Sequence, residues 1–466
     1  MGSGDDVTTF LQAPCGKVSR SRGLAAAAFA CVTLGTVGAA HATGFFIDQQ
    51  SASGLGRADA GDAAAAEDAS TVFYNPAAIT ELWRDADPSR DTILQSGMHI
   101  IIPQSHLSNA GSTATTPGTG GVPVSYPGSD AIDPGLTSPV GNAYIVHRLP
   151  NGAAYVGLGI TSPFGLAGEY RSDWFGRYDN LKASLQAVNI GPVVAVPINS
   201  YLSVGGGIDI QYQKSVLSLA IPNPLAPGGP STATDGHFDV RGDAWAVGYN
   251  LGILVKPMPA LRFGVHYRSA VDHTLTGTAT TSGFSGPLSA LNTSTGASAV
   301  SRLPNFVTSG SVYEINPKLS LFGEVSWYGW SRLRSTSVQF DNGNPPLTVP
   351  NRFRDTYALG IGAEYRWSEE LTLRTGARFD RTPTEDQFRN TSFADANRYW
   401  LAGGATYKLS EAVSIDFAFV HVIENGTHVD VTRTSFDGSA LASSVNVRAN
   451  VHSSVTTVSG AFNYRF

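Results

Sequence analysis

The sequence is poor in cysteine, in charge and in long apolar runs, and each shortage excludes a class of protein. Both cysteines, Cys15 and Cys31, lie near the N-terminus, so a chain that loses its leader has no disulfide framework and no thiol chemistry. Charged residues are 15% of the chain, whereas soluble proteins average ~25%. A formal net charge of −6 gives no indication of a nucleic-acid partner. After residue 42 no stretch approaches ~18 consecutive apolar residues, which excludes a helical membrane protein.

Residues 1–42 have the pattern of a secretory signal peptide. Lys17, Arg20 and Arg22 precede the apolar run "GLAAAAFACVTLGTVGAA", which ends in "AHA". A basic region, a short apolar core and an A-x-A site predict cleavage after Ala42. The alternative is a transmembrane anchor, but a core of mostly small side chains is shorter and weaker than the ~20 residues that a span needs. We therefore expect export of the chain.

Alternation with a period of two residues is the clearest pattern in the rest of the chain. It occurs in "SVTTVSGAFNYRF" at the C-terminus, in "DTYALGIGAEYRW" and in "LTLRTGARFD". In the second of these, Tyr357 and Trp367 bracket the strand at the spacing expected for aromatic girdles at two lipid interfaces. A soluble β-sandwich gives no reason for aromatic residues to gather at strand ends, so the pattern favours a membrane β-barrel.

Counting such strands from Asp91 onward gives fourteen, an even number, and the connections between them alternate in length. Short turns alternate with long polar loops in bacterial outer-membrane barrels, where the short turns are periplasmic. The short connections are 149–153, 198–201, 256–260, 315–319, 367–371 and 409–413. The long ones lie near 103–141, 162–182, 218–237, 276–300, 339–351, 381–397 and 424–447. The sequence therefore predicts an all-β fold, a 14-stranded antiparallel transmembrane β-barrel over residues 91–466, with both ends in the periplasm.

Residues 43–90 carry no strand pattern and form a separate N-terminal segment. They are rich in small residues, with a short helix expected over Ala63 to Asp68 and a helix cap in "YNPAAIT". A disordered leader is the simple alternative, but Phe45, Phe46 and Phe73 make the segment too apolar for a solvated tail. We expect it to fill the lumen.

Several motifs together give the chain a family resemblance. They are "SGLGRADAGDAAAAEDASTVFYNPAAIT", "ITSPFGLAGEY" followed by "WFGRYDN", "SWYGWSRL", and the block "FRDTYALGIGAEY … LRTGARFDRTP … NRYWLAGGATY". With these the chain resembles the FadL-type outer-membrane transporters, which take up long-chain fatty acids and, in some relatives, aromatic hydrocarbons. The resemblance covers nearly all of residues 43–466. It implies a 14-stranded barrel in the bacterial outer membrane, closed by an N-terminal hatch.

The resemblance also implies site residues in the hatch and in the barrel wall. The hatch residues would be Phe45 and Phe46, with the Asn-Pro-Ala element Asn75, Pro76 and Ala77. In this family the third strand is kinked and opens a lateral exit into the membrane. The matching positions are Ser162, Pro163, Phe164 and Gly165. A proline cannot donate to a β-ladder, which agrees with a kink, although Pro163 simply ending a strand is the alternative.

Two cations are the candidates for binding a substrate carboxylate. By resemblance they are Arg354 in "FRDTY" and Lys214 in "DIQYQKS". Arg354 has the parity of Thr356, which predicts a luminal side chain, whereas Lys214 has the parity of Ile210 and would face lipid unless the strand bulges. Both are open to a simpler interpretation as snorkelling or loop-directed cations.

An outer capture groove is expected in the loop that follows the kink. Its aromatic and apolar side chains would form a binding surface outside the membrane, or would instead pack on each other and plug the barrel. These side chains are Leu166, Tyr170, Trp174 and Phe175.

The function expected from the sequence is uptake of hydrophobic molecules, most of all long-chain fatty acids, by a monomer that contacts outer-membrane lipid. Aromatic-hydrocarbon uptake is the alternative within the family. In other classes, an outer-membrane lipase would need a nucleophilic serine, and no G-x-S-x-G is present. A general porin would have a charged, open lumen rather than an apolar hatch. We expect no enzyme activity, no metal site, because His421 and His428 are isolated, and no cofactor.

Overall fold

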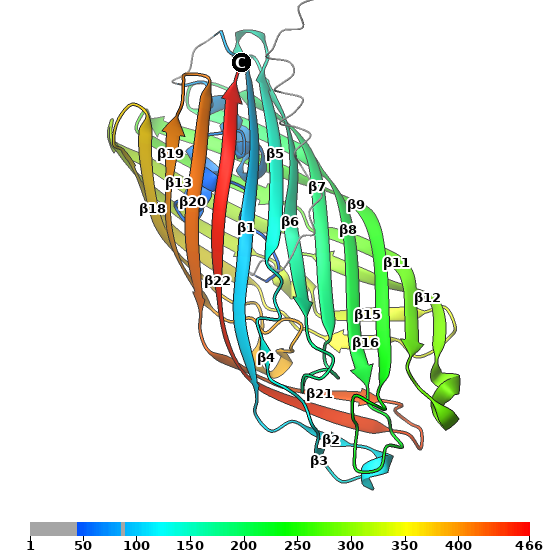
Figure 1. The fold of residues 1–466 in the computed structure, drawn as a ribbon. Helices are drawn as coiled ribbons and strands as arrows, with labels where there is room; N and C mark the ends of the chain where they lie inside the picture. The colour runs from blue at the N-terminus through cyan, green and yellow to red at the C-terminus, as the bar shows by residue number, and fades with distance from the viewer. Residues whose placement is uncertain (1–43, 85–88) are drawn as a thin grey trace, which may run out of the picture.

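The computed structural model describes residues 44–84 and 89–466, so the predicted signal peptide lies outside the described residues. Its main body is a closed antiparallel barrel of 14 strands, as the sequence predicts (Figure 1). In order around the ring, the strands are β1 (Thr92–Asn109), β5 (Ser138–Arg148), β6 (Tyr155–Glu169), β7 (Lys182–Pro197), β8 (Leu202–Ile221), β9 (Gly236–Met258), β10 (Leu261–Arg268), β13 (Phe306–Asn316), β14 (Leu319–Tyr328), β17 (Thr356–Arg366), β18 (Leu371–Asp380), β19 (Arg398–Lys408), β20 (Val413–Glu424) and β22 (Ser443–Arg465).

Alternation along each strand places apolar side chains outside the barrel. On β9 the outward residues Trp245, Val247 and Leu251 are 63%, 67% and 55% exposed, whereas the inward Asn250 and Leu254 are buried. Exposed apolar bands of this kind face lipid in outer-membrane barrels. Tyr357 and Trp367 lie on the same outer face, as the girdle pattern predicts.

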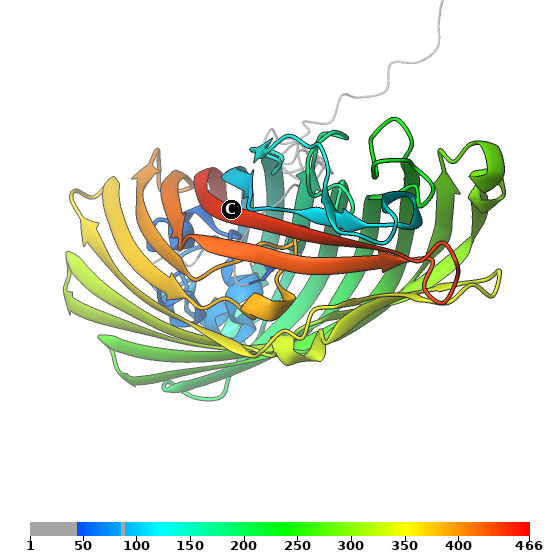
Figure 2. The same cartoon turned by 90° about the horizontal axis from the view of Figure 1, so that it is seen from below.

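The strands run further than their sequence pattern indicates, into segments predicted as loops. Beyond the apolar band lie β2 (Thr113–Thr115), β3 (Val124–Ser125), β4 (Ala131–Ile132), β11 (Val271–Ser282), β12 (Thr293–Leu303), β15 (Ser335–Phe340), β16 (Leu347–Pro350) and β21 (Thr427–Ser435). The single-turn helices η2 (Pro117–Thr119), η4 (Gly286–Leu291), η5 (Trp330–Arg332) and η6 (Asp386–Phe388) also connect strands there, whereas η3 (Pro150–Gly152) belongs to a short turn. In Figure 2 the β21–β22 hairpin crosses this end of the barrel. The predicted long loops are thus partly sheet, because polar strands outside lipid lose the apolar alternation.

The N-terminal segment lies inside the barrel, toward the end that carries the C-terminus (Figure 1). It forms α2 (Ala52–Leu55), α3 (Asp62–Ala65), α4 (Thr71–Tyr74) and η1 (Pro76–Glu81), and nearly all of its described residues are buried. The helix expected over Ala63 to Asp68 is shorter and begins one residue earlier. It ends at Ala66, whose φ of 53° is left-handed.

Glycines on the inner wall allow this close packing. A Cβ at Gly264 would lie 1.8 Å from the Ala63 carbonyl oxygen, and one at Gly376 would lie 2.0 Å from that of Arg57. Real side chains do not approach that closely, so the wall accepts the N-terminal segment only where it carries glycine. Gly205, Gly252, Gly310 and Gly404 face the segment in the same way. The glycine-rich composition is therefore partly a requirement of filling the lumen.

Candidate functional site

A buried aromatic cluster lies in the lumen, where the start of the N-terminal segment meets the wall. Phe45 packs on Trp330 with ring centroids 4.7 Å apart, and Phe46 packs on Phe306 at 4.8 Å and on Phe164 at 5.3 Å. We use the name aromatic cluster for Phe45, Phe46, Phe164, Phe306, Tyr328, Trp330, Phe353 and Phe393. All are buried, and together they form a packed apolar core in the lumen.

Strand β6 is irregular beside this cluster. Its pairing with β7 shifts register between Thr161 and Phe164, which leaves Ser162 and Pro163 out of the ladder. Proline has no N–H to donate, so the break falls at the residue that cannot continue the ladder. Pro163 therefore does not end the strand, since β6 continues to Glu169.

The neighbouring strand also separates from β6 at this point. Pairing between β5 and β6 stops at Ala143 and Ile160, and the isolated Gly135–Gly168 bridge lies beyond the break. The wall therefore lacks a continuous ladder over the first residues of β5 and the outer half of β6. All four residues predicted for a lateral opening, Ser162 to Gly165, lie beyond the last β5–β6 pair, although Phe164 and Gly165 keep their pairing with β7.

The N-terminal segment occupies the broken edge with its own main chain. The Ile47 N–H donates to the Pro163 carbonyl at 2.8 Å, and the Gly165 N–H donates to the Phe45 carbonyl at 2.9 Å. The Gln50 side chain adds a bond from Nε2 to the Ser162 carbonyl at 3.0 Å. Hydrogen bonds that β6 loses within the wall are thus replaced from inside the lumen.

The Asn-Pro turn fixes the other end of the segment. Asn75 Oδ1 accepts from the Ala77 N–H at 3.0 Å, which is the cap expected of this residue. Its Nδ2 donates to the carbonyls of Ala63, at 2.6 Å, and Ile253, at 3.1 Å. One amide therefore caps η1, ties it to α3 and ties both to β9. Helix capping and placement against the wall depend on the same side chain.

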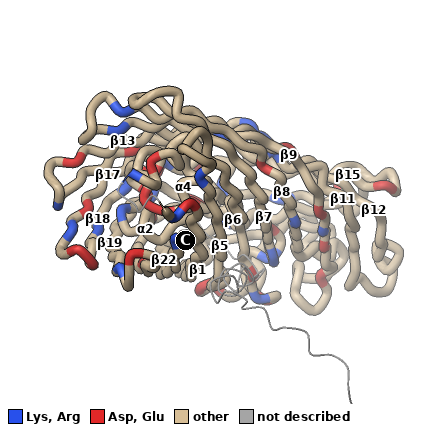
Figure 3. Tube along the Cα trace, turned by 90° about the horizontal axis from the view of Figure 1, so that it is seen from above, with Lys and Arg blue, Asp and Glu red and all other residues tan. Residues whose placement is uncertain are grey.

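Buried ion pairs join the segment to the wall, and Figure 3 shows charges of both signs around it inside the ring. Arg57 pairs with Glu67 at 2.7 Å, and Arg374 of β18 pairs with Glu67 at 3.2 Å. Arg378 of β18 pairs with Asp48 at 3.0 Å. Removing one partner of a buried pair is strongly destabilising, because the other charge stays desolvated.

At two carboxyl groups of the N-terminal segment, the nearby positive charge does not offset the effect of burial. Burial raises the pKa of Asp48 to about 6, although Arg378 opposes the rise. Burial, together with the charges of Asp62 and Asp48, raises the pKa of Asp59 well above its usual value. Arg378 is the cation nearest to Asp59, at 3.9 Å. Packing of the segment inside the lumen therefore favours the protonated forms of Asp48 and Asp59.

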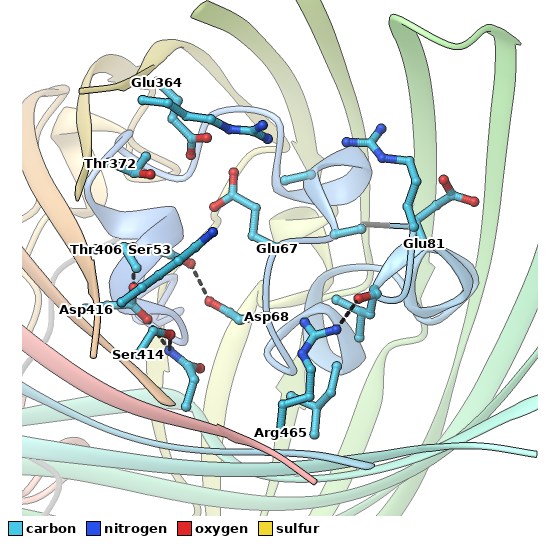
Figure 4. Close-up of a pocket in the computed structure, with 18 of the residues that line it drawn as sticks. Ser53, Glu67, Asp68, Glu81, Glu364, Thr372, Thr406, Ser414, Asp416 and Arg465 are labelled. Carbon is cyan, nitrogen blue, oxygen red and sulfur yellow. Dashed lines mark hydrogen bonds between the residues drawn. The ribbon is translucent and has the colours of Figure 1, made fainter. Parts of the chain in front are cut away.

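A polar chamber of about 320 Å³ lies between the segment and the strands at the end that carries the C-terminus (Figure 4). Glu67 and Asp68 of the segment and Asp416 and Arg465 of the wall line it. Arg465 donates to the Leu82 carbonyl at 2.8 Å, which ties the last strand to the segment. Charged walls of this kind are a poor environment for an acyl chain.

Of the two predicted head-group cations, only Arg354 lies near the aromatic cluster. It follows Phe353 of the cluster and is half-buried, and its Nε contacts the Thr382 carbonyl at 3.4 Å. No acidic side chain among the described residues forms an ion pair with it. Lys214 is exposed on the outer face, in register with Asp243 of β9. Since β8 keeps its alternation here, without a bulge, Lys214 cannot line the lumen, and its assignment to a luminal head-group site is corrected.

The expected outer groove is also corrected in part. Trp174 and Phe175 are 1% and 0% exposed, and they pack with Tyr126 and Tyr178 in a core formed by the outer loops and the end of β22. Tyr170 stacks on Trp174 at 3.9 Å. These rings therefore pack on one another and cap the barrel, which is the second of the two arrangements considered. Leu166 instead packs against the aromatic cluster.

Sequence reasoning missed most wall residues of the aromatic cluster. Phe306, Tyr328 and Phe393 lie far from Phe45 in the sequence, and local periodicity gives no information on which distant strands face each other. Tyr328 and Trp330 lie in "SWYGWSRL" and Phe353 begins "FRDTYALGIGAEY", so these two motifs were the signals available.

No helix within residues 44–84 and 89–466 has the length and apolar character needed to cross a bilayer. In the same part of the chain, no three His, Cys, Asp or Glu side chains are grouped so as to hold a metal ion.

Comparisons with known proteins find relatives over most of this chain. Residues 33–466 match the model of the outer membrane protein transport family OMPP1/FadL/TodX. A putative outer membrane protein of Neisseria meningitidis is 30% identical over 439 residues, which cover 86% of this chain and 91% of that one. The long-chain fatty acid transport protein of Escherichia coli is 27% identical over 402 residues, covering 81% and 86%.

The solved structure of a Pseudomonas aeruginosa FadL homologue has the same fold. It superposes with a TM-score of 0.77 at 21% identity, covering 91% of this chain and all of that one. This chain therefore belongs to the FadL/TodX family of outer-membrane transport proteins for hydrophobic compounds.

Proposed function

We propose that this protein takes up long-chain fatty acids through the aromatic cluster and the break in β6, with the N-terminal segment as a movable hatch. The observation that carries the proposal is the replacement of the missing β6 ladder by the main chain of Phe45 and Ile47. The same few residues both contact the cluster and cover the break. A single displacement of that stretch would therefore loosen the ligand site and uncover the wall.

The energetics favour capture and make release the demanding step. Each buried methylene contributes ~0.8 kcal/mol, so a long acyl chain gains on the order of 10 kcal/mol before its ordering cost. Release requires a change that weakens the site, and a ligand can shift the hatch only if it prefers one of its positions. Exit toward lipid keeps the chain out of water, whereas exit through the polar chamber does not.

A fatty acid, rather than a neutral hydrocarbon, is supported by two observations. Arg354 is a half-buried cation beside Phe353 of the aromatic cluster. Its charge acts on Asp386, but it forms no ion pair at contact distance among the described residues. The E. coli relative is named a long-chain fatty acid transport protein. Since buried cations are normally paired, the position suits a carboxylate of the substrate.

A reversible covalent lock tests the proposal. Phe46 and Phe164 face each other across the bridge between the N-terminal segment and β6, and the exported chain is expected to have no native cysteine. The double variant Phe46→Cys/Phe164→Cys should form a disulfide when oxidised. We expect uptake of labelled oleate, by cells that lack their own transporter, to fall at least about tenfold on oxidation and to recover on reduction.

The reduced double variant is the matched control, because it differs from the oxidised protein only in the crosslink. The single variants Phe46→Cys and Phe164→Cys should not respond to oxidant. Equal uptake by the oxidised and reduced forms would exclude movement of this stretch as part of the transport route.

A further inference from the structure

Buried polar side chains form a row on the inner wall that begins at the β6 break. Thr161 of β6 is in register with Asn189 of β7, which is in register with Gln211 of β8. On the next pair of strands Asn250 is in register with Arg268. We use the name polar row for Thr161, Asn189, Asp209, Gln211, Gln213, Asn250, His266 and Arg268, each at most 4% exposed.

The row lies at the height of the lipid band and beside the aromatic cluster. Tyr212 and Trp245, on the outer face of the same strands, stack at 5.2 Å among exposed apolar residues. Inside, His266 packs against Phe306 of the cluster at 6.1 Å. The row therefore reaches from the β6 break, at Thr161, to the aromatic cluster, at His266.

Many polar atoms of the row have no hydrogen-bond partner. Leaving such an atom buried costs stability, and an apolar side chain of similar shape would be neutral or stabilising there. The unpartnered atoms are Thr161 Oγ1, Asn189 Oδ1, Gln211 Oε1, Gln213 Oε1, Asn250 Oδ1, His266 Nε2 and Arg268 Nε. Unpartnered buried polar atoms also occur elsewhere on the wall, for example at Gln95, Asn142 and Thr457, but the row gathers seven of them on the adjacent strands β6 to β10, where a ligand with a polar group would supply partners.

The charge of the row is internally balanced. Arg268 pairs with Asp209 and donates from Nη2 to the Phe73 carbonyl at 3.0 Å, and its guanidinium lies 4.5 Å from the Phe73 ring centre. The remaining members are neutral amides, a hydroxyl and an imidazole. Thr161, Asn189, Asn250 and Arg268 also line a cavity of about 10 Å³, room for one oxygen-sized group. The row thus matches the hydrogen-bonding end of a molecule, in contrast to the unpaired cation Arg354.

We propose that the polar row is a second subsite, which hydrogen-bonds the polar end of an amphiphilic substrate as it approaches the break in β6. This deepens the proposed function and rests on it. The substrate class then consists of long-chain molecules with a hydroxyl, carboxyl or carbonyl end, and plain hydrocarbons are the poorer cargo.

The test compares a long-chain alcohol with a hydrocarbon of the same length. Binding of labelled oleyl alcohol and octadecene to the full chain in nanodiscs is measured for wild type, Gln211→Leu and Asn250→Leu. Each variant should raise the ratio of the alcohol Kd to the hydrocarbon Kd by roughly three- to tenfold, the value of one or two hydrogen bonds. Because the ratio is compared between proteins, the different solubilities of the two probes cancel.

Gln95→Leu is the matched control. Gln95 is also a buried inward glutamine with unpartnered side-chain atoms, but it belongs to β1, which pairs with β22 and β5 and not with β6. Its ratio should equal that of wild type. Gln211→Leu and Gln95→Leu should melt at or above the wild-type temperature, whereas Asn250→Leu should melt lower, because it removes the hydrogen bond from Asn250 Nδ2 to Asp209. No change of ratio in the two row variants, or an equal change in Gln95→Leu, would overturn the subsite. Failure of wild type to bind either probe would instead overturn the proposed function, and the subsite with it.

Discussion

Two contacts between neighbouring strands of the barrel, called seams here, differ in how complete their hydrogen-bond ladders are. Where the barrel closes, β1 and β22 pair without interruption from Ile93–Arg465 to Asn109–Ala449. Between β5 and β6 the ladder runs only from Arg148–Tyr155 to Ala143–Ile160, and the N-terminal segment covers the rest from inside. Closing a barrel requires a complete ladder, since unpaired backbone is costly in lipid. The incomplete seam is tolerated because the N-terminal segment supplies hydrogen bonds to β6 from inside the lumen.

The largest effect, on conductance, should come from displacing the N-terminal segment without changing the strands of either seam. Gly264→Val places side-chain atoms where the Ala63 carbonyl lies, 1.8 Å from a Cβ, so the N-terminal segment cannot seat. We expect a steady conductance in planar bilayers many times that of wild type. At Gly403 an added Cβ would meet its nearest atom at 3.9 Å, so Gly403→Val is the control. Equal conductance of the two variants would show that the segment does not close the pore.

The second largest effect should be a pH dependence of the N-terminal segment that the β1–β22 seam does not share. A carboxyl group whose pKa rises on folding, as that of Asp48 does from 3.8 to about 6, holds its proton better in the seated state. Its contribution to stability is full below pH 3.8, is lost as pH rises through 6 and is constant above that. Glu67, whose pKa is lowered from 4.5 to about 2, contributes stability that is lost only as pH falls below about 4.5.

We therefore expect hydrogen exchange in residues 44–50 to accelerate on the order of tenfold between pH 4.5 and 7, beyond the intrinsic rate change. Exchange at the β1–β22 seam should not change in this way. Asp48→Asn should flatten the response, and a seam that loosens in parallel with the segment would contradict the assignment.

A smaller effect concerns the head group. Arg354→Ala should weaken oleate binding about tenfold and weaken methyl oleate binding much less, because only the free acid offers a carboxylate. Isothermal titration with both ligands measures the difference. Lys214→Ala, on the outer face, is the control and should change neither affinity. Equal losses for acid and ester in Arg354→Ala would remove the carboxylate role.

The smallest effect should come from the break itself. Pro163→Ala restores an N–H to β6, which allows the strand to complete more of its ladder. We expect a two- to threefold reduction in the rate of oleate uptake with unchanged affinity, because the wall opens less readily. Pro192→Ala on β7 is the control, since that residue is in register with Leu158 of β6, in the part of β6 before its register shift. Faster uptake by Pro163→Ala would show that the proline does not favour opening.

The alternation of apolar and polar residues predicted the strands in the part of the barrel that faces lipid. Tyr357 to Trp367 was recognisable because one face meets hydrocarbon and the other meets the lumen. Above the lipid, β21 carries His428, Asp430 and Thr432 on its exposed face, so strand and loop look alike in sequence. The long loops were therefore predicted where the structure has strands.

Site residues were predictable only where their role depends on the residue itself and on its neighbours in sequence. Asn75 and Pro163 act through a cap and a missing N–H, which are properties of the residue and its neighbours. Burial of Trp174 depends on Tyr126 and Tyr178 and on the end of β22, a combination that no local pattern encodes. Distant packing decided both the corrected groove and the composition of the aromatic cluster.

The length of β9 and β22 sets where a substrate first meets the protein. Each spans 23 residues, about 75 Å of strand at ~3.3 Å per residue, and at a tilt of ~40° it rises roughly 55 Å. The apolar band of an outer-membrane barrel is only ~25 Å tall. The molecule is therefore taller than its membrane by about the depth of a sugar layer. Molecules arriving from outside meet folded protein before they meet lipid headgroups.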